Sequence, residues 1–401
     1  MSAHPDGSAT SAPPVGQERR GGAAALVRLL GHMLRTYGRI LAAAWRAFGL
    51  VSRELIFWAL VMPPFLLFTH TTLLLDHVFF PRLRRVRMPP PIFLIGHPRS
   101  GTTFVHRLLH ATGDYAAFRV RDIIFPALTA RGLLYPLLDL LLRRWKPGHD
   151  AAGGHAVTPD SVEEEEMLFL HLLDTQFLSF LSPLGLHEGG FAALVENDAQ
   201  PHRMAAVGFL EGCLRRQCLD SGRSQVIANM NYAALRLRSL LARFPQARVI
   251  YILRSPFAAV PSHLSLHRAM FRERWPGLEA RRPDLLQGYY HRRVAASVRL
   301  YRSMDDMIRD GTLPPDRLLL LRYEEVMADP AAALRQIFEF TGLAPSAALQ
   351  AQIAEAVGRQ HKYVRPHRNA DLSAFGIPEA ELTRDLADFN TRHGFTPGKP
   401  G

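Results

Sequence analysis

The sequence predicts an α/β fold: a central parallel sheet with helices on both faces, preceded by an N-terminal apolar helical segment. Two patterns predict it. Short apolar and β-branched runs alternate with longer stretches of helical periodicity, which is typical of a parallel sheet buried on both faces. The first run leads into a Gly/Pro turn and then a helix, the arrangement of an anion-binding loop. The expected strands are 92–95, 225–228, 248–253 and 318–322.

Composition and charge narrow the range of partners. The 401 residues include 48 Lys and Arg against 36 Asp and Glu, a formal net charge of +12. This surplus favours nucleic acid, an anionic membrane face, or phosphorylated and sulfated small molecules, although a biased genome would produce the same surplus. The two cysteines, Cys213 and Cys218, cannot form a disulfide framework, and no His/Cys cluster has zinc-site spacing. We therefore expect a cytoplasmic protein without a metal.

The N-terminal region divides into a tail and a helix. Residues 1–22 are rich in Ser, Gly, Pro and Ala and lack apolar periodicity, so we expect a disordered tail. The first apolar run starts too late for a secretory signal. From residue 23 to about residue 53, apolar residues recur at three- and four-residue spacing with arginines between them, which predicts an amphipathic helix. We expect 23–88 to be an apolar helical segment.

Residues 55–75 contain no Asp, Glu, Lys or Arg, and roughly 20 apolar residues suffice to cross a membrane. Pro63 and Pro64 would kink or break such a helix. Arginines flank both ends, so the charge asymmetry that orients a span is missing. Three interpretations stay open: a monotopic or hairpin-like association with the cytoplasmic membrane face, whose anionic lipids suit the arginines, a buried apolar helix pair, and a true span.

One α/β domain is expected from 89 to 395, and its first loop carries the chemistry. Residues 91–103 read Pro-Ile-Phe-Leu-Ile-Gly-His-Pro-Arg-Ser-Gly-Thr-Thr. Backbone N–H groups and the helix dipole converge on an anion in such a loop. The spacing of Gly96 and Gly101 matches the nucleotide P-loop, in which Lys follows the second glycine. That position is Thr102 here, and the cation is Arg99, which can form two hydrogen bonds with one anionic group.

The stretch from Pro98 to Thr103 resembles the 5′-phosphosulfate loop of sulfotransferases that use 3′-phosphoadenosine-5′-phosphosulfate (PAPS). It is most similar to the group with Arg in place of Lys, which includes tyrosylprotein, carbohydrate and many bacterial sulfotransferases. The resemblance implies a P-loop-like fold, PAPS as co-substrate, 3′,5′-ADP as product, no metal, no nucleic acid partner, and a hydroxyl or amine acceptor. The residues that it assigns to the donor are His97, Pro98, Arg99, Ser100, Gly101, Thr102 and Thr103.

Two further matches extend the resemblance over most of residues 91–345. Arg254 ends a predicted strand and Ser262 follows on the next helix, which is similar to the family's 3′-phosphate element. Tyr323 begins Tyr-Glu-Glu-Val-Met-Ala-Asp-Pro, which resembles the segment whose tyrosine lies near the nucleotide. The basic segment 361–368 stands where the family closes over the nucleotide.

Sulfuryl transfer needs a base for the proton of the acceptor and donors for the leaving oxygens. Arg99 is expected among the groups that act on the reacting atoms. The family's carboxylate base after the first helix is best matched by Asp122, although related sequences more often have Glu there. Glu164 and Glu165, from the acidic run that begins an apolar helix, are the second candidates, against the ordinary interpretation of a dipole-complementing cluster. Weaker candidates are His106, His110 and His171.

Many relatives have a Lys before the 3′ element, and the corresponding stretch here has Asn229 instead. Two alternatives therefore stay beside a PAPS-dependent sulfotransferase. One is a P-loop kinase or NTPase, against which the missing Lys argues. The other is a non-catalytic, membrane-associated member of the same family. Nothing in the helical middle of the chain identifies the acceptor, and an amphiphilic one delivered by residues 55–75 is one expectation.

Overall fold

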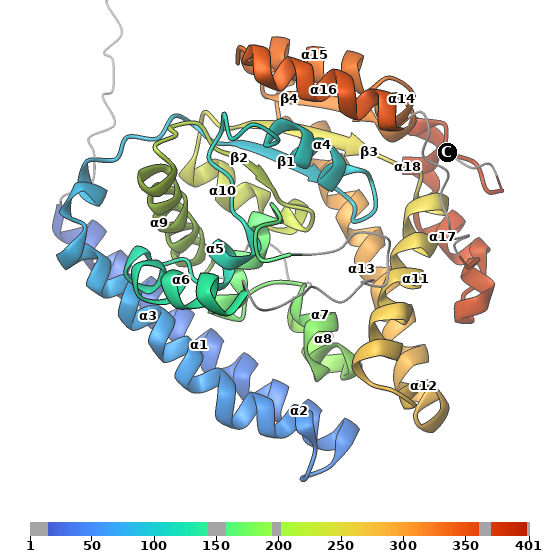
Figure 1. Ribbon diagram of the computed structural model, residues 1–401. Helices are drawn as coiled ribbons and strands as arrows, with labels where there is room; N and C mark the ends of the chain where they lie inside the picture. The colour runs from blue at the N-terminus through green and yellow to red at the C-terminus, as the bar shows by residue number, and fades with distance from the viewer. Residues whose placement is uncertain (1–14, 143–157, 195–201, 361–369, 399–401) are drawn as a thin grey trace, which may run out of the picture.

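The computed structural model describes residues 15–142, 158–194, 202–360 and 370–398. A four-stranded parallel sheet lies in the middle of the molecule, with helices on both sides (Figure 1). The strand order is β2-β1-β3-β4, with Ile92 of β1 paired to Ile227 of β2 and to Arg248 of β3. The predicted parallel sheet is confirmed. The strands are β1 (Ile92–Gly96), β2 (Ile227–Asn229), β3 (Arg248–Leu253) and β4 (Leu318–Arg322).

The strand β2 starts two residues later than predicted. Gln225 and Val226 turn toward a neighbouring loop, because the amide of Ala116 donates to the carbonyl oxygen of Gln225 and Ala116 forms an isolated bridge with Val226. The other three strands occupy the predicted positions to within one residue.

Alternate residues of the central strands face two different cores. Leu94 and Ile250 point to the side of α4, α14, α15 and α16, whereas Phe93 and Val249 point to the side of α9, α10 and α13. This alternation follows from the period of two in a strand, and it explains why β1 is buried along its whole length. The covering helices are α4 (Thr102–Leu109), α14 (Tyr323–Ala328), α15 (Pro330–Thr341), α16 (Ala347–Gln360), α9 (Arg203–Ser221), α10 (Leu237–Arg243) and α13 (Pro283–Arg309).

The N-terminal helices form a separate layer along one side of the domain (Figure 1). The amphipathic helix predicted from residue 23 is α1 (Val15–Phe48), which begins earlier than expected. The predicted tail 1–22 is therefore wrong for residues 15–22, because helix propagation adds one hydrogen bond for each residue that it fixes. Residues 1–14 lie outside the described residues. The rest of this layer is α2 (Arg53–Ile56), η1 (Phe57–Val61), α3 (Met62–Phe79), η2 (Pro81–Arg85) and α6 (Leu128–Leu142).

Pro63 and Pro64 do not break the apolar segment, contrary to the prediction. The stretch η1 is a single π-helical turn, and the two prolines follow it in the first turn of α3, where an intrahelical N–H donor is not needed. Arg53–Phe79 is consequently one helical stretch that is long and apolar enough, by length and composition, to cross a membrane. Only 22% of its most apolar window is buried, so the interpretation as a buried helix pair is wrong.

Shorter elements connect these layers. The acidic run leads into a 3-10 helix, η3 (Glu165–Leu172), rather than into an α-helix. The remaining elements are α5 (Val120–Ile124), α7 (Leu178–Leu181), η4 (Pro183–Leu186), α8 (Glu188–Leu194), η5 (Ala233–Leu235), α11 (Pro256–Arg274), α12 (Leu278–Arg281), η6 (Pro315–Arg317), η7 (Leu372–Phe375), α17 (Glu379–Asp385) and α18 (Ala387–His393).

Candidate active site

The loop between β1 and α4 is a tight turn that contains two residues with positive φ angles. Gly101 precedes the first residue of α4 with a φ of 83°, and Arg99 has a φ of 77°, a left-handed conformation that is strained for a residue with a side chain. A Cβ atom on Gly96 would lie 2.9 Å from the carbonyl oxygen of Ile252. The loop therefore depends on glycine at Gly96 and Gly101, and it holds Arg99 in a conformation that needs support from its surroundings.

Two hydroxyl groups line the start of α4. The side chain of Ser100 is fully buried, and its oxygen has no hydrogen-bond partner among the described residues. The hydroxyl of Thr102 donates to Oδ1 of Asn231 at 2.7 Å. A buried polar group without a partner usually marks a place where a further group binds. Together with the N-terminal amides of α4, Ser100 fits an anionic group at this helix end.

Four of the predicted donor-binding residues lie together beside the loop. Nε of Arg99 donates to Oγ of Ser262 at 3.2 Å, and the guanidinium of Arg254 donates to the carbonyl oxygen of Arg99. The same guanidinium lies 4.1 Å from the centre of the Tyr323 ring. Arg254 is buried, and its carbonyl oxygen accepts from the hydroxyl of Tyr301, so the end of β3 fixes this arginine in place. Thr103 lies in the first turn of α4.

His97 differs from its prediction, because its side chain points into the protein. Its Nε2 lies 2.9 Å from Oγ of Ser297, and its ring stacks on Tyr301 with centroids 5.1 Å apart. Burial lowers the pKa of His97 to about 3, so the ring is neutral. His97 and the buried Pro98 shape the turn through their backbone and packing.

The acidic run lies next to this loop. Arg107 of α4 forms an ion pair with Glu163 at 2.5 Å, one turn after the loop. The carboxyl of Glu164 is hydrogen-bonded to Asn231, the residue that Thr102 also contacts. Burial, and after it the neighbouring Glu163, raises the pKa of Glu164 to about 8. Oε2 of Glu164 has no partner among the residues that the structure describes, so this carboxyl has both a suitable pKa and an available oxygen for proton transfer.

Glu165, the other candidate of this run, has a structural role. Its Oε2 accepts from the amide of Asn229 at 2.7 Å, its Oε1 accepts from the amide of Phe118 at 3.4 Å, and its Oε2 lies 3.3 Å from Nε2 of His106. A carboxylate that is held in this way by backbone donors fixes the end of β2 relative to η3. Both oxygens of Glu165 thus have partners, which favours Glu164 over Glu165 as the candidate base.

Both carboxyl oxygens of Asp122 also accept hydrogen bonds within the protein. Its Oδ2 accepts from the amide of Arg119 at 2.9 Å, which caps α5, and its Oδ1 accepts from the hydroxyl of Tyr135 at 2.7 Å. Arg131 lies 3.8 Å away. None of these partners belongs to the donor loop, so the structure shows Asp122 as the cap of α5, and its expected catalytic role stays a prediction. The cap satisfies backbone donors that a short helix leaves unpaired.

The three histidine candidates are also structural. Nε2 of both His106 and His110 lies near the carbonyl oxygen of Ile227, at 3.3 Å and 3.1 Å, and His171 bonds to the carbonyl oxygen of Ile123 at 2.8 Å. Burial lowers the pKa of His110 to about 3 and that of His171 to about 4. These rings join helices to neighbouring backbone.

Two asparagines, one at the end of β2 and one two residues later, complete the candidate site. Asn229 is fully buried at the end of β2, and neither polar atom of its side chain has a partner within the described ranges. Asn231 links Thr102 to Glu164 and was missed by the sequence-based prediction. The signal available for it was the sequence Asn-Met-Asn at the end of a strand that pairs with β1. The predicted basic segment 361–368 lies outside the described residues.

One group of side chains has the composition of a metal site. Ligand atoms of His32, Asp174 and His202 lie within 4.8 Å of one another. Asp174 is already bound by two guanidinium groups, Arg203 at 2.8 Å and Arg236 at 3.4 Å. Burial alone would raise the pKa of Asp174, but the two arginines outweigh it and hold the pKa well below its usual range. Two fixed positive charges at the same carboxylate disfavour a cation there.

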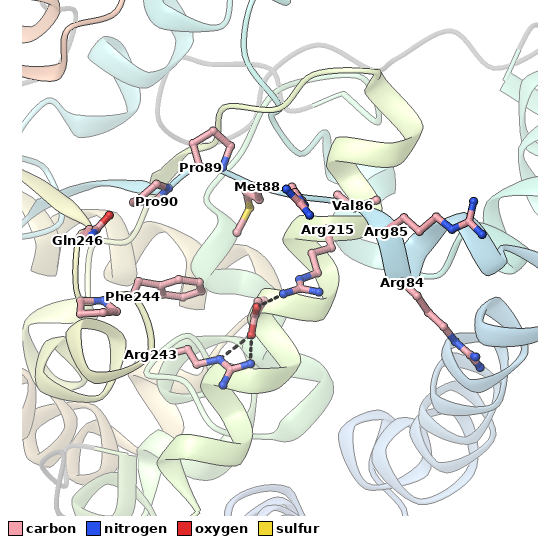
Figure 2. Close-up of a pocket in the computed structure, with 13 residues that line it drawn as sticks. Arg84, Arg85, Val86, Met88, Pro89, Pro90, Arg215, Arg243, Phe244 and Gln246 are labelled. Atoms are coloured by element: carbon pink, nitrogen blue, oxygen red, sulfur yellow. Dashed lines mark hydrogen bonds and ion pairs between the residues drawn. The ribbon is translucent and has the colours of Figure 1, made fainter. Parts of the chain in front are cut away.

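A large cavity lies away from the donor loop. It has a volume of about 910 Å³ and is lined by arginines, among them Arg84, Arg215 and Arg243 (Figure 2). Pro90 and Gln246, which precede β1 and β3, also line it. It therefore opens at the amino ends of the strands, whereas the donor loop lies at their carboxyl ends.

Comparison with known proteins decides the family. The family model described as "Sulfotransferase family" matches residues 90–346, which is more than half of the chain. This chain belongs to the sulfotransferase family. The predicted family is confirmed, and the match overturns the alternative of a P-loop kinase or NTPase.

Two curated relatives of this sulfotransferase carry the same name. The chain is 25% identical over 265 residues to omega-hydroxy-beta-dihydromenaquinone-9 sulfotransferase Stf3 of Mycobacterium bovis and of Mycobacterium tuberculosis. The match covers 63% of this chain and 63% of each relative. The chain thus spans less than two thirds of the length of these relatives.

Solved sulfotransferase structures share the fold. The crystal structure of STF9 from Mycobacterium avium is 18% identical with a TM-score of 0.63, covering 91% of this chain and 97% of that one. The structure of STF1 from Mycobacterium tuberculosis H37Rv is 17% identical with a TM-score of 0.58, covering 94% and 99%. The predicted P-loop-like fold with a central parallel sheet is confirmed by this likeness.

Proposed function

We propose that this sulfotransferase moves a sulfuryl group from PAPS to a hydroxyl group of an amphiphilic acceptor. The observation that carries the proposal is the arrangement of Arg99, Ser262, Arg254 and Tyr323 beside the loop that begins α4. The N-terminal amides of α4 and the buried Ser100 hydroxyl suit the 5′-phosphosulfate. Arg254 with Ser262 would hold the 3′-phosphate, as the family resemblance implies.

The reaction that these residues support is an in-line displacement. The acceptor oxygen attacks sulfur, its bond to sulfur forms while the bond from sulfur to the 5′-phosphate oxygen breaks, and the leaving phosphate takes the electron pair. Arg99 and the loop amides stabilise the negative charge that develops on the leaving oxygens. The acceptor proton passes to Glu164, whose raised pKa allows it to accept a proton near neutral pH. Asn231 orients Glu164 relative to Thr102 of the loop.

Two observations support a lipid-like hydroxyl as the acceptor. The curated relatives are named for a menaquinone that carries an omega-hydroxyl group. In this chain, the helical layer α1–α3 and α6 exposes a large apolar surface, as detailed below.

A thermal-shift measurement tests the donor. We expect PAPS and 3′,5′-ADP to raise the melting temperature without Mg²⁺, and ADP, which lacks the 3′-phosphate, to raise it much less. Arg99→Ala removes the shift, whereas Arg299→Ala, which changes an exposed arginine of α13, keeps it. Equal shifts with ADP and 3′,5′-ADP would contradict the assignment of the 3′-phosphate site.

Transfer of ³⁵S from labelled PAPS into a lipid extract tests the reaction. Label in the lipid fraction supports the amphiphilic acceptor, and label only in glycan, protein or small-molecule fractions contradicts it. Donor binding without transfer to any fraction would instead identify the alternative, a non-catalytic member of the family.

A further inference from the structure

The helical layer at the N-terminus exposes nearly all the large hydrophobic side chains that lie on the surface of the described residues. Nineteen of the twenty-two such side chains belong to residues 26–79 or to α6. Leu67 and Leu74 of α3 are each 70% exposed, and Leu133 of α6 is 63% exposed. We define the apolar face as the exposed side of α1, of the stretch Arg53–Phe79 and of α6. So many exposed large apolar side chains in one layer of helices indicate an interaction site.

The outward side of α3 carries no Asp, Glu, Lys or Arg. Leu67, Thr71, Leu74 and Val78 recur there at spacings of three and four residues, which places them on one side of the helix. The opposite side of the stretch is attached to the domain at three places along its length. Near its first residue, Nε1 of Trp275 donates to Oε1 of Glu54 at 2.9 Å.

The C-terminal end of α3 is attached to the domain by hydrogen bonds to one carboxylate. The buried carboxylate of Asp76 accepts from Nε of Arg216 at 2.7 Å and from the amide of Thr129 at 2.7 Å. In the middle, Nε2 of His70 lies 3.1 Å from the carbonyl oxygen of His171. A helix attached to the protein along its whole length cannot cross a bilayer without taking the domain with it. It can, however, lie in the plane of the interface with its free side in the lipid.

Arginines surround the apolar face. Residues 23–91 contain nine arginines and only two carboxylates, and neither carboxylate is available: Asp76 is buried, and Glu54 accepts from Nε1 of Trp275. Arg53 stands at one end of the apolar stretch, and Arg82, Arg84, Arg85 and Arg87 stand at the other, all exposed. None of these five forms an ion pair with a carboxylate of the described residues.

The arginine-lined cavity extends this charge. Helix η2, which follows α3 directly, contributes Arg84 and Arg85 to the cavity shown in Figure 2. Glu211 pairs with Arg215 and Arg243 on its far wall, so the arginines of η2 supply the uncompensated charge. A cavity of about 910 Å³ with this lining, placed at the end of an apolar helix, fits the phosphate of a lipid headgroup.

From these observations we infer that the apolar face docks monotopically on an anionic lipid bilayer, with the arginines of η2 in contact with lipid phosphate. Charge decides between this occupant and a second copy of the chain. Two copies meeting face to face would bring two arginine rims together, whereas an anionic leaflet neutralises them at about 1 kcal/mol for each arginine. The inference is independent of the donor chemistry, because it uses no residue of the loop after β1.

Flotation with preformed vesicles tests the inference on the full chain. We expect it to float with vesicles of 70% phosphatidylcholine and 30% phosphatidylglycerol, and to float several-fold less at 0.5 M NaCl or with pure phosphatidylcholine. The double variant Leu67→Glu/Leu74→Glu should lose binding to both compositions. Its matched control is Arg299→Ala/Arg309→Ala, which changes the net charge equally on exposed positions of α13 and should float like the wild type.

A second pair of variants separates charge from apolar contact. Arg84→Ala/Arg85→Ala should weaken binding to the anionic vesicles by about 5-fold for each arginine and leave binding to phosphatidylcholine unchanged. Every variant should unfold in urea with the cooperativity of the wild type, which shows that each is folded without use of a nucleotide. A wild type that floats with neither composition, or a Leu67→Glu/Leu74→Glu variant that floats like the wild type, overturns the inference. A dimer in lipid-free buffer that this variant dissociates overturns it as well, in favour of an interface between copies.

Discussion

Replacing Glu164 with Gln should affect activity and stability in opposite directions. Burial raises the pKa of Glu164 from 4.5 to about 8, so the folded protein binds this proton more tightly than the unfolded chain does. Stability from this group is therefore greatest below pH 4.5 and falls as the pH rises from 4.5 to 8. At about 1.4 kcal/mol for each pH unit, the loss at pH 7 is roughly 3 kcal/mol. Partial exposure of Glu164 reduces the expected loss to about 1–2 kcal/mol.

Glutamine keeps the size of the side chain and the hydrogen bond to Asn231 but cannot lose a proton. Glu164→Gln should thus raise the free energy of unfolding by about 1–2 kcal/mol at pH 7.5 and change it little at pH 5. Its transfer rate should fall by about 10²–10⁴-fold, and the rise of the wild-type rate as the pH approaches 8 should disappear. Urea unfolding at the two pH values and single-turnover transfer of ³⁵S measure these effects.

The adjacent glutamate supplies the control. Glu163→Gln breaks the ion pair with Arg107, so it should lower stability slightly and leave most of the transfer activity. A Glu164→Gln variant that transfers at the wild-type rate, or that is less stable than the wild type at pH 7.5, would refute the assignment of Glu164 as the base.

Three further changes have defined outcomes. Arg254→Ala should weaken the binding of 3′,5′-ADP by about 10- to 100-fold in calorimetry, because it removes charge-assisted hydrogen bonds. Gly96→Ala should lower the free energy of unfolding by about 1–3 kcal/mol in urea, because the new Cβ would lie 2.9 Å from the carbonyl oxygen of Ile252. Asp76→Ala should cost about 3–5 kcal/mol in the same assay, because it leaves the charge of Arg216 buried and unpaired.

The common control for these three variants is Arg299→Ala. Arg299 is exposed, so its replacement should alter neither the free energy of unfolding nor nucleotide binding. Unchanged affinity in Arg254→Ala would remove this residue from the donor site. If Gly96→Ala lowers the free energy of unfolding by less than about 0.5 kcal/mol, the prediction is wrong and the turn relaxes to admit the new Cβ atom. If Asp76→Ala lowers it by less than this amount, water reaches the guanidinium of Arg216.

The sequence was sufficient for the features that depend on local patterns. The strand, turn and helix around Gly101 are contiguous in the chain, so their order alone predicted the anion-binding loop. Arg254 and Ser262 were predicted from the family resemblance, and the structure places both beside the loop after β1. A strand end and the following helix form one local unit, so their neighbourhood was visible in the sequence. The parallel arrangement followed from alternation of strands with helices.

The choice of the base could not be made in the same way, because it depends on contacts between distant segments. Asp122 and Glu165 have the same type of side chain as Glu164, or one shorter by one carbon. The hydroxyl of Tyr135 donates to Asp122, and the amide of Asn229, 64 residues away in the chain, donates to Glu165. Only the folded arrangement leaves an oxygen of Glu164 available. The sequence pattern also overstated the effect of the prolines, since it gave no sign of the π-helical turn before α3.

The bond between Asp76 and Arg216 has a practical consequence for the preparation of this protein. The family match begins at residue 90, which invites removal of everything before it. Such a truncation would remove Asp76 and leave the buried guanidinium of Arg216 in α9 without this carboxylate. It would also expose the part of the hydrophobic core that Leu29 covers. The N-terminal layer is thus part of the folded domain, and a more polar variant is better made by placing charged residues on the outer side of this layer than by deleting the layer.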